Sequence, residues 1–159
     1  MLLHINIKAP MKLEDEIKQN KFKSEHHKMV LNIIYTAHWV ELQNTRMLKP
    51  LGISPQQYNI LRILRGQHPN PASITLLQDR MMDKMSNASR LVEKLRIKGL
   101  IERIQCEEDR RQCDVFISKM GLEVLKQLDE VFDNQNESLK VLTHEEAKIV
   151  NELLDKLRN

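Results

Sequence analysis

The chain has 159 residues, of which 41% are hydrophobic and 30% charged, and its formal net charge is +3. This length suits one well-packed domain, or a small domain with added dimerisation helices. No apolar window of about 18 residues and no signal-peptide pattern occur, so we expect a soluble protein of a reducing cytoplasm without a membrane segment.

The first elements are an arm and a long helix. Residues 1–25 are predicted to form an N-terminal arm, in which the charged run MKLEDEIKQNKFK is either a short helix or flexible. From Ser24 to about Met47 the apolar residues mostly recur at helical spacing, which predicts a helix. Pro50 and Gly52 are expected to end it.

Three shorter helices follow. SPQQYNILRIL begins with Ser54 as N-cap and Gln57 completing a capping box. ASITLLQDRMM predicts a second helix capped by Ser73, and after the break DKM a third begins at Ser86 and ends at Gly99. Two short helices joined by a tight turn, the second with a basic outer face, predict a helix-turn-helix.

After these helices the sequence period changes. LIERIQC and CDVFIS alternate apolar and polar residues around the polar EEDRRQ, which predicts a β-hairpin. With the turn centred between Asp109 and Arg110, Cys106 would lie opposite Cys113. Such thiols could form a strained, reducible disulfide, or be two incidental small residues.

Two helices are predicted in residues 119–159, one capped by Ser118 and one by a capping box of Thr143 and Glu146. Lys and Arg number 10 against 6 Asp and Glu in residues 1–79, 10 against 7 in residues 80–119, and 5 against 9 in residues 120–159. The first two blocks can therefore face a polyanion, whereas the last cannot easily do so. Ordinary solvated faces are the alternative.

The predicted helix-turn-helix carries candidate DNA-binding residues. A helix in the major groove reads base edges with short polar side chains near its N-terminus. Lys94, one turn further along, would neutralise a phosphate. The candidates for the base edges are Ser86, Asn87, Ser89 and Arg90. Because any exposed helix can carry such residues, an ordinary surface helix is the alternative.

The hairpin tip adds three candidates. Long cationic side chains on a narrow loop can enter the minor groove, and Arg110 and Arg111 are placed to do so. Asp109 could hold one guanidinium through a charge-assisted hydrogen bond. Glu107 and Glu108 would repel phosphate, so a solvated tip stays the alternative.

The stretch DRRQCDVFISKMG resembles the wing motif of the MarR family of bacterial winged-helix transcriptional regulators, D-x-R-x-x-x-V-x-L-T-x-x-G. Ile117 and Ser118 stand for Leu and Thr, and the matching residues are Asp109, Arg111, Val115 and Gly121. SNASRLVEKLRIKGLIER is similar to the recognition helix running into the first wing strand, with Asn87-Ala88 in place of the more usual Thr-Val. The resemblance covers about residues 28 to 157.

The resemblance implies a mainly α (α+β) fold with a winged helix-turn-helix domain at 50–118 and a short β-hairpin wing. Dimerisation helices at 26–49 and 119–159 would flank it. The protein would be a homodimeric regulator in a bacterial cytoplasm, and we expect a ligand-responsive repressor that binds a pseudo-palindromic operator in double-stranded DNA. Arg111 would enter the minor groove, oriented by Asp109, and Arg110 would contact the backbone.

Many relatives release DNA when a phenolic or lipophilic compound enters the crevice between dimerisation helices and winged domain. Five residues are candidates for lining this crevice: Tyr35, His38, Trp39, Met47 and Tyr58. The alternative is that they pack in the core or in the dimer interface. No catalytic, metal-ligand or cofactor motif occurs, so we expect a non-enzyme without metal or cofactor. Alternative functions are a winged-helix protein interaction module and a thiol-based redox sensor that uses Cys106 and Cys113.

Overall fold

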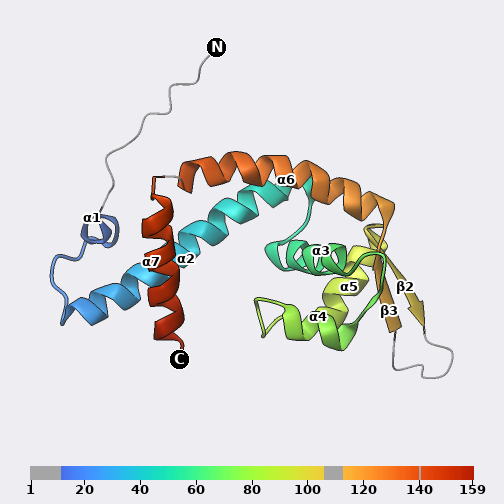
Figure 1. Cartoon of the computed structure of the whole chain (residues 1–159), viewed down its shortest axis with the longest axis horizontal. Coiled ribbons are helices and arrows are strands. Elements are labelled where there is room, and N and C mark those ends of the chain that lie inside the picture. The colour runs from blue at the N-terminus through green and yellow to red at the C-terminus, as the bar shows by residue number, and fades with distance from the viewer. Residues whose placement is uncertain (1–11, 106–112, 140) are drawn as a thin grey trace, which may run out of the picture. The chain divides into compact units, whose positions relative to one another are not determined.

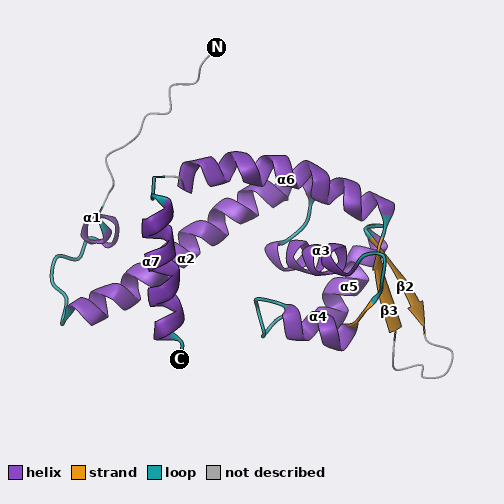
Figure 2. Ribbon diagram, viewed as in Figure 1, coloured by secondary structure: helices purple, strands orange, loops and turns teal. Residues whose placement is uncertain are grey.

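The computed structural model describes residues 12–105, 113–139 and 141–159 (Figure 1), with only the backbone described at 105 and 134–139. It is mostly helical with one small antiparallel sheet (Figure 2), which confirms the expected fold class. The chain divides into two compact units, residues 1–46 and residues 47–159. Within the described ranges, no helix is both long and apolar enough to cross a membrane.

The first unit consists of a short helix attached to a long one. Helix α1 spans Leu13–Ile17, where the sequence left a short helix and a flexible arm open. Helix α2 spans Glu25–Leu48, as the helical spacing predicted. Glu14 of α1 forms an ion pair with Lys28, and the hydroxyl of Tyr35 donates a hydrogen bond of 2.7 Å to Glu16. Residues 13–17 of the predicted arm therefore form a short helix held by polar contacts to α2.

The second unit begins with a 3-10 turn, Lys49–Leu51, followed by helix α3, Pro55–Gln67. The predicted capping box of α3 is confirmed: Ser54 Oγ accepts from Gln57 N–H at 3.2 Å, and Gln57 Oε1 accepts from Ser54 N–H at 3.0 Å. Helix α3 is central because Ile60 and Leu64 are fully buried in the core of the unit.

Helix α4 spans Ile74–Arg80 and α5 spans Ala88–Ile97. The predicted cap at Ser73 is confirmed by its hydrogen bond from Leu76 N–H, 3.1 Å long. The predicted start of the next helix at Ser86 is wrong by two residues. Asn87 is the N-cap of α5, because its Oδ1 accepts from the N–H of Arg90 at 2.9 Å.

A three-stranded antiparallel sheet stands beside these helices in the order β1-β3-β2. Its strands are β1, Ala72–Ser73, β2, Ile101–Gln105, and β3, Cys113–Ile117, so the hairpin strands are confirmed and β1 is an addition. Gln105, and not Cys106, pairs with Cys113, so the predicted register is wrong. Burial of Cys113, 4% exposed, with Val115 and Ile117 fixes which face of β3 meets the core.

Helix α5 ends in a Schellman motif. Gly99 adopts φ +70°, its N–H donates to the carbonyl of Arg96 at 2.9 Å, and Leu100 N–H donates to Leu95 at 3.1 Å. A left-handed residue at this position satisfies the last helical carbonyls, and glycine adopts it without strain. The chain then turns directly into β2.

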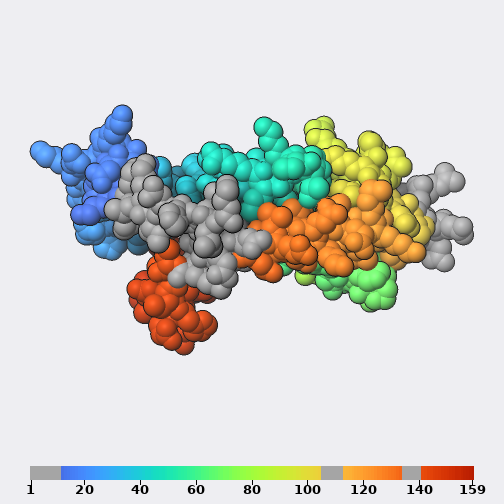
Figure 3. All heavy atoms as spheres, turned by 90° about the horizontal axis from the view of Figure 1, so that it is seen from above, coloured from blue at the N-terminus to red at the C-terminus, as the bar shows by residue number. Residues whose placement is uncertain are grey.

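Helix α6, Lys119–Leu139, begins against the same corner. Ser118 is its cap: Oγ accepts from Gly121 N–H at 3.0 Å and donates to the carbonyl of Gly99 at 2.7 Å. A Cβ on Gly121 would lie 2.2 Å from the carbonyl oxygen of Leu100, so only glycine allows this approach. Figure 3 shows the described first part of α6, in orange, lying directly against other residues of the second unit.

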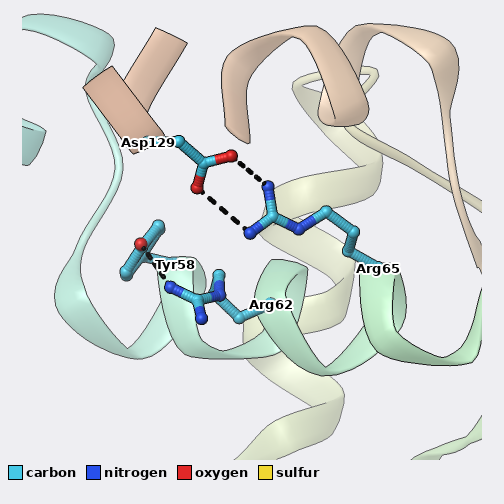
Figure 4. A network of polar contacts seen from close by, with 4 residues as sticks. All are labelled: Tyr58, Arg62, Arg65 and Asp129. Atoms are coloured by element: carbon cyan, nitrogen blue, oxygen red, sulfur yellow. Dashed lines mark hydrogen bonds and ion pairs between the residues drawn. The ribbon is translucent and has the colours of Figure 1, made fainter. Parts of the chain in front are cut away.

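Polar and aromatic contacts join α6 to α3, and Figure 4 shows the polar ones. Arg65 forms a two-pronged ion pair with Asp129, with Nη1–Oδ2 and Nη2–Oδ1 distances of 2.7 and 3.1 Å. Tyr58 stacks on Phe132 of α6 at a centroid distance of 4.8 Å. Within α3, Arg62 donates to the Tyr58 hydroxyl at 3.0 Å. The Arg65 guanidinium lowers the pKa of Asp129 by hydrogen bonding to its carboxylate.

The last helix, α7, spans His144–Leu157 and starts with the predicted capping box, in which Thr143 Oγ1 accepts from Glu146 N–H at 3.2 Å. Its apolar side chains recur at helical spacing and are exposed. They are Ile149, Val150, Leu153 and Leu157.

Candidate nucleic-acid interface

The turn between α4 and α5 is held by one glutamine from α4. The Nε2 of Gln78 donates to the carbonyl of Lys84 at 3.2 Å, and its Oε1 accepts from the N–H of Ala88 at 3.1 Å. The second bond satisfies an N–H group of the first turn of α5 that has no partner inside the helix. One side chain thus ties the turn and the start of α5 to α4.

Two further side chains fix the same turn. Asn59 of α3 accepts from the N–H of Met82 at 2.9 Å through its Oδ1. Asp83 accepts from the N–H of Met85 at 3.0 Å and from the hydroxyl of Ser86 at 2.6 Å. The Ser86 hydroxyl, followed by the Met85 amide, lowers the pKa of Asp83, so this carboxylate stays ionised.

Gln78, Asn59 and Asp83 were not among the residues predicted from the sequence. Asp83 could have been found as a turn-forming residue, since aspartate often bonds to backbone N–H groups two residues further on. The contacts of Asn59 and Gln78 reach 23 and 10 residues along the chain, so no local pattern announces them.

Helix α5 presents the predicted residues on its outer face. Ala88, Val92 and Leu95 are buried, whereas Ser89, Arg90 and Lys94 are exposed. A groove-binding helix must show polar and basic groups on the side opposite its core contacts. Asn87 is exposed too, but its Oδ1 caps the helix, which leaves its amide nitrogen for an outside partner.

An ion pair occupies the middle of α5. Glu93 and Arg96 form two hydrogen bonds, with Nη2–Oε1 and Nε–Oε2 distances of 2.8 and 3.1 Å. The Arg96 side chain lowers the pKa of Glu93. Arg96 thereby offsets the only acidic charge within α5, which leaves the outer face positive at Arg90 and Lys94.

The wing candidates Asp109, Arg110 and Arg111 lie outside the described residues, as does Cys106. The described part of the wing is its two strands, which pair from Ile101 opposite Ile117 to the last pair before the tip. The roles of Asp109, Arg110 and Arg111 at the wing tip therefore stay predictions.

The five effector candidates fall into both units. In the first unit, His38 and Trp39 are exposed, and the pKa of Tyr35 is raised by its hydrogen bond to Glu16. In the second unit, Met47 is half-buried and Tyr58 is stacked on an aromatic neighbour. A common crevice for these five side chains stays a prediction.

A helix-turn-helix followed by a two-stranded hairpin defines a winged helix-turn-helix domain. Residues 53–113 match the model of the MarR family. This match confirms the resemblance to the MarR family of transcriptional regulators seen in the sequence.

Solved structures share this fold. A MarR transcription factor from Planctomyces limnophilus is 28% identical with a TM-score of 0.65, covering 87% of this chain and 98% of that one. The organohalide-sensing regulator RdhR-CbdbA1625, bound to 2,4-dichlorophenol, is 22% identical with a TM-score of 0.76, covering 99% and 89%. S. aureus MepR in complex with DNA is 18% identical with a TM-score of 0.67, covering 87% and 96%.

Proposed function

We propose that this protein is a sequence-specific DNA-binding regulator that acts as a homodimeric, ligand-responsive repressor on a pseudo-palindromic operator. The observation that carries the proposal is the fixed N-terminus of α5. Gln78 and Asn87 hold its first turn, while Ser89, Arg90 and Lys94 are exposed beside it. A recognition helix needs this combination of fixed position and free polar groups.

Each candidate has a role in this proposal. Ser89 and Arg90 face base edges, with Arg90 suited to guanine, and Lys94 neutralises a phosphate. The amide nitrogen of Asn87 reaches an acceptor on a base or phosphate. Ser86 contributes through the turn, since its hydroxyl is bound to Asp83.

The wing completes the proposed interface. Arg111 enters the minor groove, Asp109 orients it and Arg110 contacts the backbone, as in the family whose motif these residues match. The DNA-binding domain is then residues 50–118, with 26–49 and 119–159 as dimerisation helices and 1–25 as an arm.

Exposed apolar faces on two helices support the homodimer. Large apolar side chains on α2 are exposed at Met29, Val30, Ile34, Trp39, Val40 and Leu42. Helix α7 has its own exposed apolar face, described above, and the acidic C-terminal block does not suit DNA. Light scattering after size exclusion tests this: a mass near twice 18.7 kDa is expected.

A phenolic compound is the proposed effector, because the regulator with 2,4-dichlorophenol shares the fold and the candidates include two tyrosines and the single tryptophan. Titration of chlorophenols against tryptophan fluorescence therefore reports on Trp39 alone. Saturable quenching that is weakened in Tyr58→Phe or His38→Ala supports the crevice. Linear, non-saturable quenching in all three proteins would refute it.

Selection of random duplex DNA at two salt concentrations tests the central proposal. A pseudo-palindrome is expected, with binding that weakens as salt rises because phosphate contacts release counterions. Lys94→Ala is expected to weaken all sequences alike and reduce the salt slope by about 1. Arg90→Ala is expected to relax the base preference at one position in each half-site. Lys126→Ala, on the exposed face of α6, serves as the control. Duplex binding that is absent or insensitive to salt would favour a protein interaction module instead.

A further inference from the structure

Two methionines in the turn between α4 and α5 face solvent almost completely. Met85 is 94% exposed and Met82 is 89% exposed, the highest values among large hydrophobic side chains in the described part of the chain. Their neighbour Met81 is 1% exposed and belongs to the core. The turn thus separates one methionine that stabilises the fold from two that do not.

The backbone of the turn is held so that these two side chains stay outside. Asn59 binds the N–H of Met82, and Asp83 binds the N–H of Met85. Gln78 binds the carbonyl of Lys84 between them. Three side chains from three segments therefore define one backbone conformation of the turn, in which both thioethers lie outside the core.

The position of the turn limits what can cover the methionines. Met85 lies two residues before Asn87, the N-cap of α5, and therefore beside the side chains proposed to read bases. From Arg80 to Lys98 there are six Lys and Arg residues against two Asp and Glu residues. This surface attracts a polyanion, so an apolar contact here is a contact with an apolar group of the nucleic acid.

We propose that Met85, together with Met82, packs against the 5-methyl groups of thymines in the major groove, next to the bases faced by α5. The thymine methyl is the apolar group that the major groove offers, and it distinguishes thymine from the other bases. A methionine suits it because the unbranched thioether adapts to irregular apolar surfaces. The inference rests on the proposed function and adds a thymine preference to it.

Deoxyuridine tests the contact directly, since it keeps every hydrogen-bonding group of thymine and lacks only the methyl. Removing one buried methyl from an interface is expected to weaken binding about threefold to fivefold. Each thymine of the selected operator is replaced in turn by deoxyuridine, and the affinity of the full-length protein is measured at fixed salt. Met85→Ala, Met82→Ala and the double variant are measured on the same duplexes.

One or two positions in each half-site are expected to show the loss with the unmodified protein. Met85→Ala is expected to bind the thymine duplex about threefold to fivefold more weakly and to lose its response to deoxyuridine at those positions. Met120→Ala, at a methionine that is 57% exposed on α6, is the control and should behave like the unmodified protein. Because all three side chains are highly exposed, these substitutions are expected to leave the protein folded.

Two outcomes would overturn the proposal while leaving DNA binding intact. One is equal affinity of the unmodified protein for thymine and deoxyuridine duplexes. The other is full deoxyuridine sensitivity in the Met82 and Met85 double variant. Failure to bind any duplex would instead overturn the proposed function, and the thymine contact with it.

Discussion

Replacing Gly121 by alanine is expected to destabilise the second unit by about 2 kcal/mol. The added Cβ would lie 2.2 Å from the carbonyl oxygen of Leu100 and 2.9 Å from Cγ1 of Ile117. Relief requires α6 to move away from the corner, although Ser118 N–H donates to this same carbonyl at 3.1 Å. The backbone oxygen cannot rotate away as a flexible side chain would.

The magnitude follows from three contributions. Overpacking costs about 1–3 kcal/mol, and loss of the Ser118 cap adds about 1 kcal/mol. The higher helix propensity of alanine compared with glycine offsets about 1 kcal/mol of this destabilisation. The balance of about 2 kcal/mol is expected to lower the urea midpoint by about 1 M, for a slope of about 2 kcal/mol per M.

Urea unfolding followed by circular dichroism measures this, at one fixed protein concentration so that any dimerisation contributes equally. Gly66→Ala is the matched control. Gly66 lies inside α3, is exposed, and nothing lies within 4 Å of an added Cβ. The free energy of unfolding of this variant is expected to rise by about 0.5–1 kcal/mol. An unchanged midpoint for Gly121→Ala beside a raised midpoint for Gly66→Ala would refute the close approach at Leu100.

Further substitutions test other contacts. Gln78→Ala should weaken operator binding and lower stability by about 1–3 kcal/mol, because Ala88 N–H and Lys84 C=O lose their partner; unchanged operator affinity would contradict its positioning role. In thermal unfolding, Asn87→Ala should lower stability by about 1 kcal/mol because α5 loses its N-cap. Asn87→Ser should lower it by less, since serine can also cap a helix. Asp129 has a lowered pKa, so its pair with Arg65 contributes stability above the unfolded carboxyl pKa that is lost as pH falls through the folded value. The stability difference between wild type and Asp129→Asn should therefore be present at pH 6 and shrink below about pH 4; a difference independent of pH would exclude the ion pair as its cause. Leu153→Glu, at an exposed position, should leave helicity unchanged and shift the mass in light scattering to a monomer.

The corner of α5, β2 and α6 explains part of the wing motif. Ser118 bonds Gly99 and caps α6, and Gly121 allows α6 to approach Leu100. These two motif positions therefore act on the fold. The contacts join the end of the proposed recognition helix to the hairpin and to α6, and we infer that they set where the wing stands relative to α5.

Most local features of this protein could be predicted from the types of neighbouring residues. Ser54, Ser73 and Thr143 were identified as helix caps, and each accepts a hydrogen bond from a residue three positions further along. Gly99 was identified as the end of α5. Such features depend on neighbours within one helical turn, and the residue types that can serve are few. The family resemblance added the order of these elements in a winged domain.

Contacts between distant segments could not be predicted in this way. Gln78 of another helix holds the N–H of Ala88 at the start of α5. The cap at Asn87 and the bond of Ser86 to Asp83 are local contacts that were not predicted from the sequence. The hairpin register was also a tertiary matter. Two registers one residue apart have similar local sequence patterns but bury opposite faces of the strand. The face of β3 with Cys113 contacts the core, and exposing this apolar face would cost free energy. The register that buries it pairs Cys113 with Gln105.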